Sequence, residues 1–317
     1  MPAVSRIAAT RPRPSWLRLR VAVAPVLAVA GLATVATVAA PGAGPASVAS
    51  AAEAPAQAHG AAAPAAEPRH ARRIAVGIGT FNVLGSQHTA RGGDRKRFPP
   101  ASVRSRRAAR LIAAHRVDIL GTQELQLDQL AALRSRTGMA AYPGRRWGSK
   151  ETDNSILYDA HRFKFVSGRK FVIPFMGRPR PQPILRLKDR ASGRQFYVVN
   201  THPSAHGGRY LRERRHGERV LVSVVKRLKA TGLPVLVTGD MNDREKFYCH
   251  VVPRAGLVAA NGGSYAHGCH PPRTPVPVDW VVGSRGTRWT GYWRDTRPVT
   301  RRISDHFLVS ATAHLRR

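Results

Sequence analysis

The sequence predicts one α/β domain with many strands, and two observations carry this prediction. Beyond Arg73, short apolar runs alternate with amphipathic stretches. Apolar runs bounded by turn residues are typical of buried strands, and apolar positions three or four residues apart are typical of helices. The 317-residue chain also has no internal repeat and no second linker. We therefore expect these elements to share one core.

The apolar runs beyond Arg73 predict eight strands, at residues 74–83, 117–124, 154–158, 163–173, 195–202, 234–240, 278–283 and 307–315. Two helices are predicted between them, because apolar side chains recur there on one helical face. These faces consist of Ala108, Leu111, Ile112 and His115 in the first helix and of Val220, Leu221, Val224, Val225 and Leu228 in the second.

The N-terminal region has the pattern of a secretory signal. Five Arg residues precede an uncharged apolar run at residues 21–40, and small residues follow it. This order predicts export, with a signal peptide over residues 1–52 and cleavage between about Ala49 and Ala54. An uncleaved membrane anchor is the alternative, since twenty apolar residues can span a bilayer.

Residues 53–73 are rich in Ala and Pro and poor in large apolar side chains, so we expect a disordered linker before a folded domain at 74–317. The chain has 52 Lys and Arg against 18 Asp and Glu, a net charge of +34. The five Arg before Ala52 account for five of these charges, because no acidic residue precedes Ala52, and the rest of the chain carries +29. This excess predicts a polyanionic partner, with solubility or compositional drift as the alternative.

Polar residues recur where the predicted strands end. In α/β sheets, strand ends are where ligands bind, because rigid elements aim side chains into one crevice. Each residue also has a simpler explanation, such as a turn, a helix cap or a structural histidine. The joint set is harder to explain in that way, and it consists of Asn82, Glu124, His202, Asp240, Asn242, Asp279, Asp305 and His306.

Several of these stretches resemble the endonuclease/exonuclease/phosphatase superfamily. The matching stretches are "TFNVLG", "ILGTQE", "NSILYDAHRF", "VVNTHPSAH", "VLVTGDMND", "VDWVVG" and "ISDHFLVSA". The resemblance runs from about residue 74 to the C-terminus. It implies a four-layer α/β sandwich, with two mixed β-sheets packed face to face and helices outside, and it implies metal-dependent hydrolysis of phosphoric esters.

The resemblance assigns metal binding to Glu124, with Asn82 and Asp305 nearby. Glu124 is a hard oxygen ligand of the kind that Mg²⁺ prefers, and Mn²⁺ or Ca²⁺ are the other ions considered. Some relatives carry a second carboxylate two residues after the Asn of the first strand. This chain has Leu84 there, which leaves Glu124 as the main metal ligand.

The resemblance also implies the catalytic residues. His306 is the expected general base, with Asp279 fixing the tautomer of its imidazole. Asp240 and Asn242, two residues apart in a turn, are expected to hold the attacking water and a phosphate oxygen. His202 is expected to donate to a phosphoryl oxygen or to the leaving group.

The segment before "ISDH" interleaves Trp289, Tyr292 and Trp293 with Arg residues. Aromatic faces for bases and guanidinium groups for phosphates are what nucleic-acid grooves use. The alternative is that Trp289 and Trp293 are core residues of a strand pair. The expected substrate-binding residues are Arg294, Arg297, Arg301 and Arg302, together with Asn154 at the start of "NSILYDAHRF".

Cys249 and Cys269 are the only cysteines, and an exported chain favours a disulfide between them. Zinc bound by these cysteines and their neighbouring histidines is the alternative. Secreted deoxyribonucleases of the family also place a disulfide in this part of the chain.

These observations predict a secreted, monomeric nuclease that requires a divalent cation and binds nucleic acid or another phosphate-rich polyanion. Contact with a membrane is expected only if the N-terminal apolar segment is retained. A phosphatase or phospholipid-directed phosphodiesterase, acting on inositol phosphates or sphingomyelin, is the first alternative. A non-catalytic polyanion-binding protein is the second.

Overall fold

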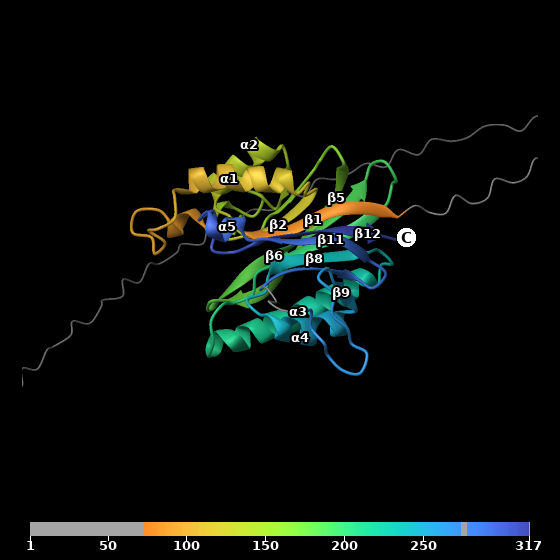
Figure 1. Cartoon of the computed structure of the whole chain (residues 1–317). Coiled ribbons are helices and arrows are strands. Elements are labelled where there is room, and N and C mark those ends of the chain that lie inside the picture. The colour runs from red at the N-terminus through yellow and green to blue at the C-terminus, as the bar shows by residue number, and fades with distance from the viewer. Residues whose placement is uncertain (1–72, 274–277, 317) are drawn as a thin grey trace, which may run out of the picture. The chain divides into compact units, whose positions relative to one another are not determined.

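The structure is a computed structural model that describes residues 73–273 and 278–316 (Figure 1). It contains two six-stranded mixed sheets with helices. The predicted fold class is confirmed. The predicted signal peptide and all of the predicted linker except Arg73 lie outside the described residues. No helix in the described part of the chain is long and apolar enough to cross a membrane.

The first sheet has the strand order β11-β12-β1-β2-β4-β3. Its β1 and β2 run parallel, and its other pairs are antiparallel. The strands are β1 (Ile74–Asn82), β2 (Ile119–Gln123), β3 (Ala140–Tyr142), β4 (Ile156–Tyr158), β11 (Arg288–Asp295) and β12 (Leu308–Leu315).

The second sheet has the order β5-β6-β7-β8-β10-β9, with β7 and β8 parallel and the other described pairs antiparallel. The strands are β5 (Phe163–Phe175), β6 (Arg178–Asp189), β7 (Gln195–Thr201), β8 (Val235–Asp240), β9 (Leu257–Ala259) and β10 (Asp279–Ser284).

Helices cover the outer faces of the two sheets (Figure 1). Apolar side chains from both sheets, such as Ile78 and Leu236, pack together in the middle of the sandwich. A second cluster packs α1 and α2 on the first sheet, and a third packs α3 and α4 on the second. The helices are α1 (Ala101–Ala114), α2 (Leu127–Thr137), α3 (Arg209–Lys229), α4 (Glu245–Ala255) and α5 (Arg297–Thr300), with short 3₁₀ helices η1 (Ser86–His88) and η2 (Ser149–Glu151).

The eight predicted strands and both predicted helices are present, and the apolar helix faces point inwards. On α1, Ala108, Leu111 and Ile112 are buried, whereas His115 lies just past the helix end and binds Asp295. The buried residues of the second face are Leu221, Val224, Val225 and Leu228, with Val220 packed beside them.

The sequence analysis missed four strands, β3, β6, β9 and β11, and β6 has a clear physical reason. Three prolines, Pro179, Pro181 and Pro183, ordinarily exclude a strand inside a sheet, because proline cannot donate to the ladder. In β6 all three lie opposite β5 only, since pairing with β7 begins at Ile184, opposite Val199. The proline-rich half therefore lies at a local sheet edge, where proline is tolerated.

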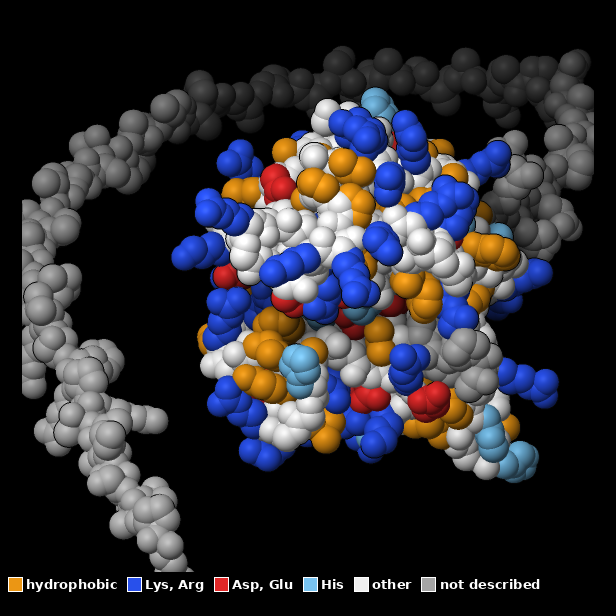
Figure 2. Space-filling model, turned by 60° about the vertical axis from the view of Figure 1, so that its left-hand side comes forward, with side chains coloured by type: hydrophobic (Ala, Val, Ile, Leu, Met, Phe, Trp, Pro, Cys, Tyr) orange, Lys and Arg blue, Asp and Glu red, His pale blue; other side chains and the backbone are white. Residues whose placement is uncertain are grey.

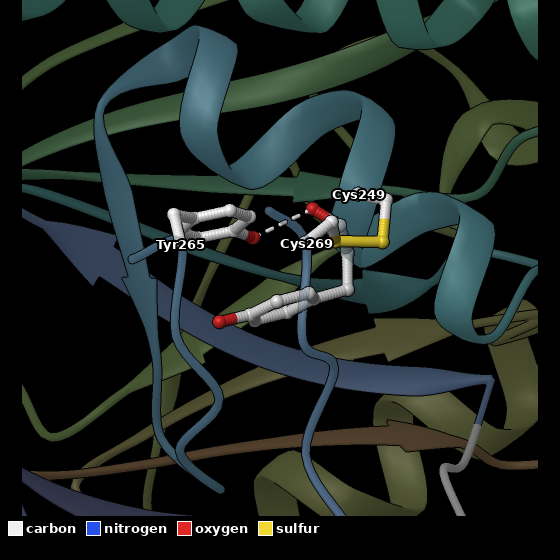
Figure 3. Close-up of a disulfide and its surroundings, with 4 residues drawn as sticks. Cys249, Tyr265 and Cys269 are labelled. Carbon is white, nitrogen blue, oxygen red and sulfur yellow. Dashed lines mark hydrogen bonds between the residues drawn. A yellow bond between two sulfur atoms is a disulfide. The ribbon is translucent and has the colours of Figure 1, made fainter. Parts of the chain in front are cut away.

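Cys249 of α4 and Cys269 of the following loop form a disulfide (Figure 3). The predicted bond is therefore present, and both sulfur atoms are unavailable to zinc. Beside it, the rings of Tyr248 and Tyr265 stack with centroids 4.8 Å apart, and the Tyr265 hydroxyl donates to the Tyr248 carbonyl. The disulfide and the stacked rings together fix the segment from Tyr265 to Cys269, which follows β9, on α4.

Replacing both cysteines with alanine should lower the free energy of unfolding by about 3 kcal/mol, because the bond closes a loop of 20 residues and restricts the unfolded chain. Urea titration of the variant and of the parent would measure the difference. Tyr265→Phe, which removes only the hydroxyl contact, serves as a smaller perturbation of the same loop. An unchanged urea midpoint in the double variant would contradict a stabilising role.

Candidate active site

The polar residues predicted at strand ends come together at one end of the two sheets. Because β1 and β2 run parallel, as do β7 and β8, their carboxyl ends share an edge of the sandwich. In the antiparallel pair of β10 and β8, Asp279 lies directly opposite Asp240. Side chains from several separate segments therefore lie together at this edge of the sandwich.

Asp240 is the centre of this group. Its side chain is 1% exposed, and its Oδ2 atom lies 3.4 Å from His202 Nε2 and 3.5 Å from His306 Nε2. Asn82 Nδ2 donates to the same oxygen at 3.2 Å, and the Asn242 N–H donates to Oδ1 at 2.9 Å. Burial alone would raise the pKa of Asp240, but the two histidines and the Asn242 N–H outweigh it and lower the pKa. The buried carboxylate is therefore ionised.

Asp279 holds His306 in one orientation. His306 Nδ1 lies 3.0 and 3.1 Å from the two Asp279 oxygens, so Nδ1 carries a proton and Nε2 faces Asp240. Burial lowers the pKa of His306, but the charges of Asp279 and Asp240 outweigh it and raise the pKa to about 10. In this state the imidazole is a cation at neutral pH, so it can donate a proton or bind a phosphoryl oxygen. The predicted role of general base requires that a proton leave it first.

Asn82 joins the carboxylates of Glu124 and Asp240. Its Oδ1 accepts the Leu84 N–H at 3.0 Å, and this bond fixes the direction of the amide. Its Nδ2 then donates to Glu124 Oε1 at 2.9 Å and to Asp240. Asn82 therefore turns an amide N–H group, not an oxygen, towards Glu124. In this arrangement Asn82 orients two carboxylates, and its role as a metal ligand stays a prediction.

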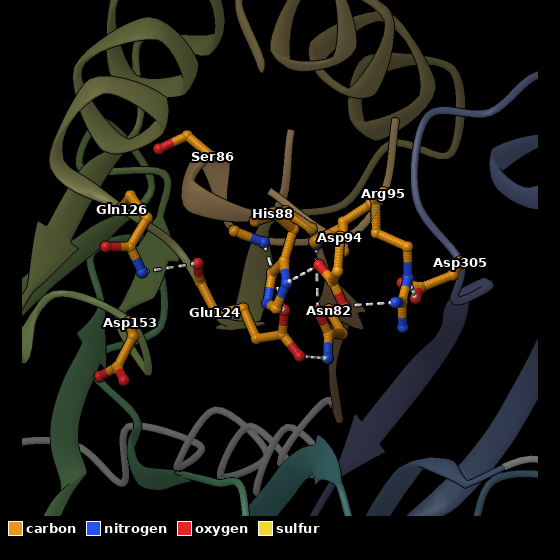
Figure 4. Close-up of polar contacts among 12 residues, drawn as sticks. Asn82, Ser86, His88, Asp94, Arg95, Glu124, Gln126, Asp153 and Asp305 are labelled. Atoms are coloured by element: carbon orange, nitrogen blue, oxygen red, sulfur yellow. Dashed lines mark hydrogen bonds and ion pairs between the residues drawn. The ribbon is translucent and has the colours of Figure 1, made fainter. Parts of the chain in front are cut away.

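A chain of alternating charges covers the outer part of the site (Figure 4). His88 Nε2 lies 3.4 Å from Glu124 Oε2, and its Nδ1 lies 2.8 Å from Asp94. Arg95 joins Asp94 at 2.6 Å and Asp305 at 3.2 Å. The sequence analysis missed His88, Asp94 and Arg95, because they lie in an irregular loop after β1 and not at a strand end.

This chain of charges sets the ionisation of its members. Burial raises the pKa of Glu124, but the His88 contact, the charge of His202 and the Asn82 hydrogen bond outweigh it and lower the pKa far below its usual range. In return, the hydrogen bond with Glu124 is the largest of the effects that raise the pKa of His88 to about 9. Glu124 is therefore an anion with a cationic neighbour.

A buried arginine ties these loops together. Arg104 of α1 is 1% exposed, and its Nη1 atom donates to the carbonyls of Val83 and Leu84 at 2.7 Å and to that of Ile303 at 3.2 Å. Its Nη2 atom donates to the Thr89 hydroxyl at 3.2 Å. One guanidinium group thus connects the end of β1, the loop that carries His88, and the segment that leads to Asp305.

One wall of the site comes from β6, which the sequence analysis missed. Arg180 forms an ion pair with Asp153 and lies over the ring of Phe175, 4.1 Å from its centroid. The Phe175 ring in turn lies 5.1 Å from that of His202. The structure therefore adds Arg180 and Phe175 to the residues beside His202.

Asn154, predicted to bind substrate, lies in the same wall. Its Nδ2 donates to Gln182 Oε1 at 3.1 Å, and that oxygen also accepts the His202 N–H at 2.8 Å. The Asn154 side chain is buried, and its Oδ1 has no hydrogen-bond partner. Asn154 thus positions the backbone of His202 through Gln182 and keeps one acceptor free.

A protein-family model described as the endonuclease/exonuclease/phosphatase family matches residues 79–316. The chain belongs to this family.

Solved structures of similar fold include family members with different names. An endonuclease/exonuclease/phosphatase family protein from Bacteroides thetaiotaomicron has 20% sequence identity and a TM-score of 0.59, covering 76% of this chain and 98% of that one. A mannosyl-6-phosphatase from the same organism has 20% identity and a TM-score of 0.57, covering 76% and 100%. The human Nocturnin catalytic domain has 22% identity and a TM-score of 0.57, covering 77% and 96%. At these identities the likeness establishes the fold. A search of curated proteins finds no match.

Endonuclease/exonuclease/phosphatase enzymes use divalent metals, and the residues of this domain fit one. Glu124 and Asp305 are partly exposed carboxylates, the hard oxygen ligands that Mg²⁺ takes singly or in pairs with water and substrate. Asp240, Asp279 and His306 also offer ligand atoms within 4.8 Å of one another. In that group, however, the Asp279–His306 separation of 3.0 Å is that of a hydrogen bond, so a proton already joins the two residues. The partly exposed carboxylates on the Glu124 side therefore fit a cation better.

The four Arg residues predicted to bind substrate differ in how far other protein groups already bind them. Arg297 forms two or more hydrogen bonds with the buried Asp295 and also contacts His115, so its guanidinium group has a structural role. Arg294 lies over the ring of Phe307, 5.1 Å from its centroid. Arg301 and Arg302 are exposed, and Arg302 donates to the Arg97 carbonyl.

The aromatic residues of β11 also divide. Trp289 and Tyr292 pack against the core between the sheets, and Trp289 Nε1 donates to the Val258 carbonyl. Trp293 is 58% exposed. The alternative reading of these residues as core is therefore correct for Trp289 and wrong for Trp293.

Asp279→Asn should lower the pKa of His306 from about 10 by about two units, because it removes the negative charge next to Nδ1. An NMR pH titration of the histidine side chains in metal-free protein would measure the change. Asp295→Asn is the matched control, since Asp295 lies against a different histidine, His115. If both variants left the titration of His306 unchanged, Asp279 would not control its charge.

Proposed function

We propose that this chain is an exported, divalent-cation-dependent hydrolase of phosphodiester bonds with nucleic acid as its substrate. The observation that carries the proposal is Asp240, an ionised buried carboxylate with the Nε2 atoms of His202 and His306 at 3.4 and 3.5 Å. A negative group that can orient water, flanked by two groups that can donate to a phosphoryl oxygen, is suited to phosphoryl hydrolysis. Export is inferred from the basic, apolar and small-residue regions of the N-terminus.

In this proposal the inner residues divide the work on the phosphate. Asp240 orients the attacking water and accepts its proton, and His306, held by Asp279, places its Nε2–H against a phosphoryl oxygen. His202 holds a proton towards the leaving oxygen, with Phe175 against its ring. A divalent cation held by Glu124 would stabilise negative charge on the phosphoryl oxygens.

Charge supports nucleic acid over a small substrate. Beyond Ala52 the chain carries 47 basic and 18 acidic residues. Figure 2 shows Asp, Glu and His side chains at the bottom of a recess that Lys and Arg side chains surround. A rim of this kind matches the many phosphates of a polymer on both sides of the bond to be cut.

A phosphatase that acts on small phosphate esters is the second candidate, since a mannosyl-6-phosphatase has a similar fold. One assay distinguishes the two candidates. It measures, under the same conditions, the hydrolysis of DNA, RNA, a sugar phosphate, an inositol polyphosphate and sphingomyelin. Turnover of a monoester alone would replace the nuclease proposal.

A chelator should abolish hydrolysis and Mg²⁺ or Mn²⁺ should restore it, because Glu124 is an ionised carboxylate at the edge of the site. Glu124→Gln should weaken Mn²⁺ binding tenfold or more, as measured by electron paramagnetic resonance, since it removes the charged ligand. Glu245→Gln, in the first turn of α4, is the control and should bind Mn²⁺ like the parent. Full activity after exhaustive chelation would exclude the cation from the reaction.

His306→Ala and Asp240→Asn should each lower kcat by about a hundredfold or more, roughly 3 kcal/mol of barrier, because each removes a group facing the phosphate. Binding of DNA in the presence of chelator should persist. His161→Ala, an exposed histidine outside the site, is the control. Steady-state rates on a DNA substrate measure kcat for each variant. A residue whose replacement changes kcat by less than about threefold, roughly 0.7 kcal/mol of barrier, would have no essential role.

A further inference from the structure

The exposed face of α1 is strongly basic. The helix sequence "ASVRSRRAARLIAA" has four Arg residues and no acidic residue. Arg104 is buried, whereas Arg106, Arg107 and Arg110 are exposed. None of these three forms an ion pair with a carboxylate in the described part of the chain.

This arrangement is unfavourable for the helix itself. Arg106 and Arg110 are four residues apart and Arg107 and Arg110 three apart, so like charges are neighbours on the helix surface. Folding does not account for this cluster of like charges, and an anionic partner would relieve the repulsion.

The basic face continues towards the active site. Arg107 Nη1 donates to the Arg301 carbonyl at 3.2 Å, and Arg302 Nη1 donates to the Arg97 carbonyl at 3.2 Å. These contacts join α1, the loop after β1 and the segment that leads to Asp305. We call the resulting surface the α1 basic surface, and it consists of Lys96, Arg97, Arg106, Arg107, Arg110, Arg301 and Arg302.

We propose that the α1 basic surface binds the phosphate backbone of a nucleic acid strand whose reacting phosphate lies at Asp240 and His306. The inference rests on the proposed function, and it extends the binding surface to α1. Guanidinium groups bind phosphate through paired N–H donors, and several in a row follow a backbone without reading its sequence.

A nucleic acid fits this surface better than a membrane does. Binding to anionic lipid usually combines basic residues with large apolar side chains that enter the bilayer. None of the exposed large apolar side chains in the described residues lies on α1 or in the loop between β1 and α1, and in the segment of Arg301 and Arg302 there is one, Val299, which is 37% exposed. One partly exposed valine is a poor membrane anchor, so the surface offers mainly charge.

The test compares two triple variants with equal loss of charge. The first is Arg106→Gln, Arg107→Gln and Arg110→Gln, which keeps good helix formers on α1. The control is Lys226→Gln, Arg227→Gln and Arg285→Gln, at the opposite end of the strands from Asp240, where these residues are also exposed. Fluorescence anisotropy with a short labelled DNA duplex, in chelator and at several salt concentrations, measures binding.

The α1 variant should bind DNA about tenfold or more weakly near physiological salt, and its slope of log K against log salt should fall by roughly two to three units. The control should change the affinity by less than about threefold, and its slope should change little. The α1 variant should unfold at the parent temperature or higher, because it loses repulsion between like charges, and both variants should hydrolyse bis(p-nitrophenyl) phosphate like the parent. Equal weakening by the two variants would mean that diffuse net charge binds DNA, and would overturn the proposal.

Two further outcomes separate this inference from the proposed function. If the α1 variant binds and cuts DNA like the parent, the surface assignment fails and the nuclease function stands. If the parent hydrolyses no phosphodiester but loses DNA binding in the α1 variant, the function fails and the surface stands. Binding by the parent to phosphatidylserine vesicles and not to DNA would overturn the choice of partner.

Discussion

The active site depends on keeping one buried carboxylate charged. A buried ionised carboxylate is costly unless other groups neutralise and hydrogen-bond it. Asp240 receives these contacts from Asn82 at the end of β1, His202 after β7 and His306 before β12. The need to neutralise Asp240 therefore restricts the relative position of the two sheets at this edge. A sheet displaced by one residue would move a donor away and leave the charge unpaired.

A second buried charge holds the outer part of the site in a different way. Arg104 has no carboxylate partner within ion-pair distance among the described residues, and the carbonyls of Val83, Pro99 and Ile303, from three segments, accept its N–H groups. Burial lowers the pKa of this guanidinium group, although arginine stays charged in proteins. The same helix thus positions the loops through its buried arginine and presents its other arginines to solvent. The inner face of α1 serves the site, and its outer face is free for a partner.

The residues of the inner site could be picked out from the sequence because each lies at one end of an apolar run, and apolar runs are visible in a sequence. The sequence did not predict His88 or Arg95, since their roles come from contacts with residues far along the chain, such as Arg95 with Asp305. It missed Arg180 because prolines hide β6, and their tolerance depends on which neighbour pairs with each half of the strand. The hydrogen bonds of Asn82 depend on the orientation of its amide. The Leu84 N–H, which donates to Asn82 Oδ1, sets that orientation.

The inner residues of the site, around Asp240, and its outer residues, around Glu124, differ in how far solvent reaches them. Asp240, Asp279 and His202 are almost fully buried, so their charges are balanced by fixed groups and by protons. Among the outer residues, His88 is 31% exposed and Glu124 25%, and the cationic partners belong to a loop. A side-chain cation on a loop can be exchanged for an ion from solvent at little cost to the core. This difference supports the proposal that a divalent cation binds at the outer carboxylates, while the buried group of Asp240, Asp279 and His306 stays fixed.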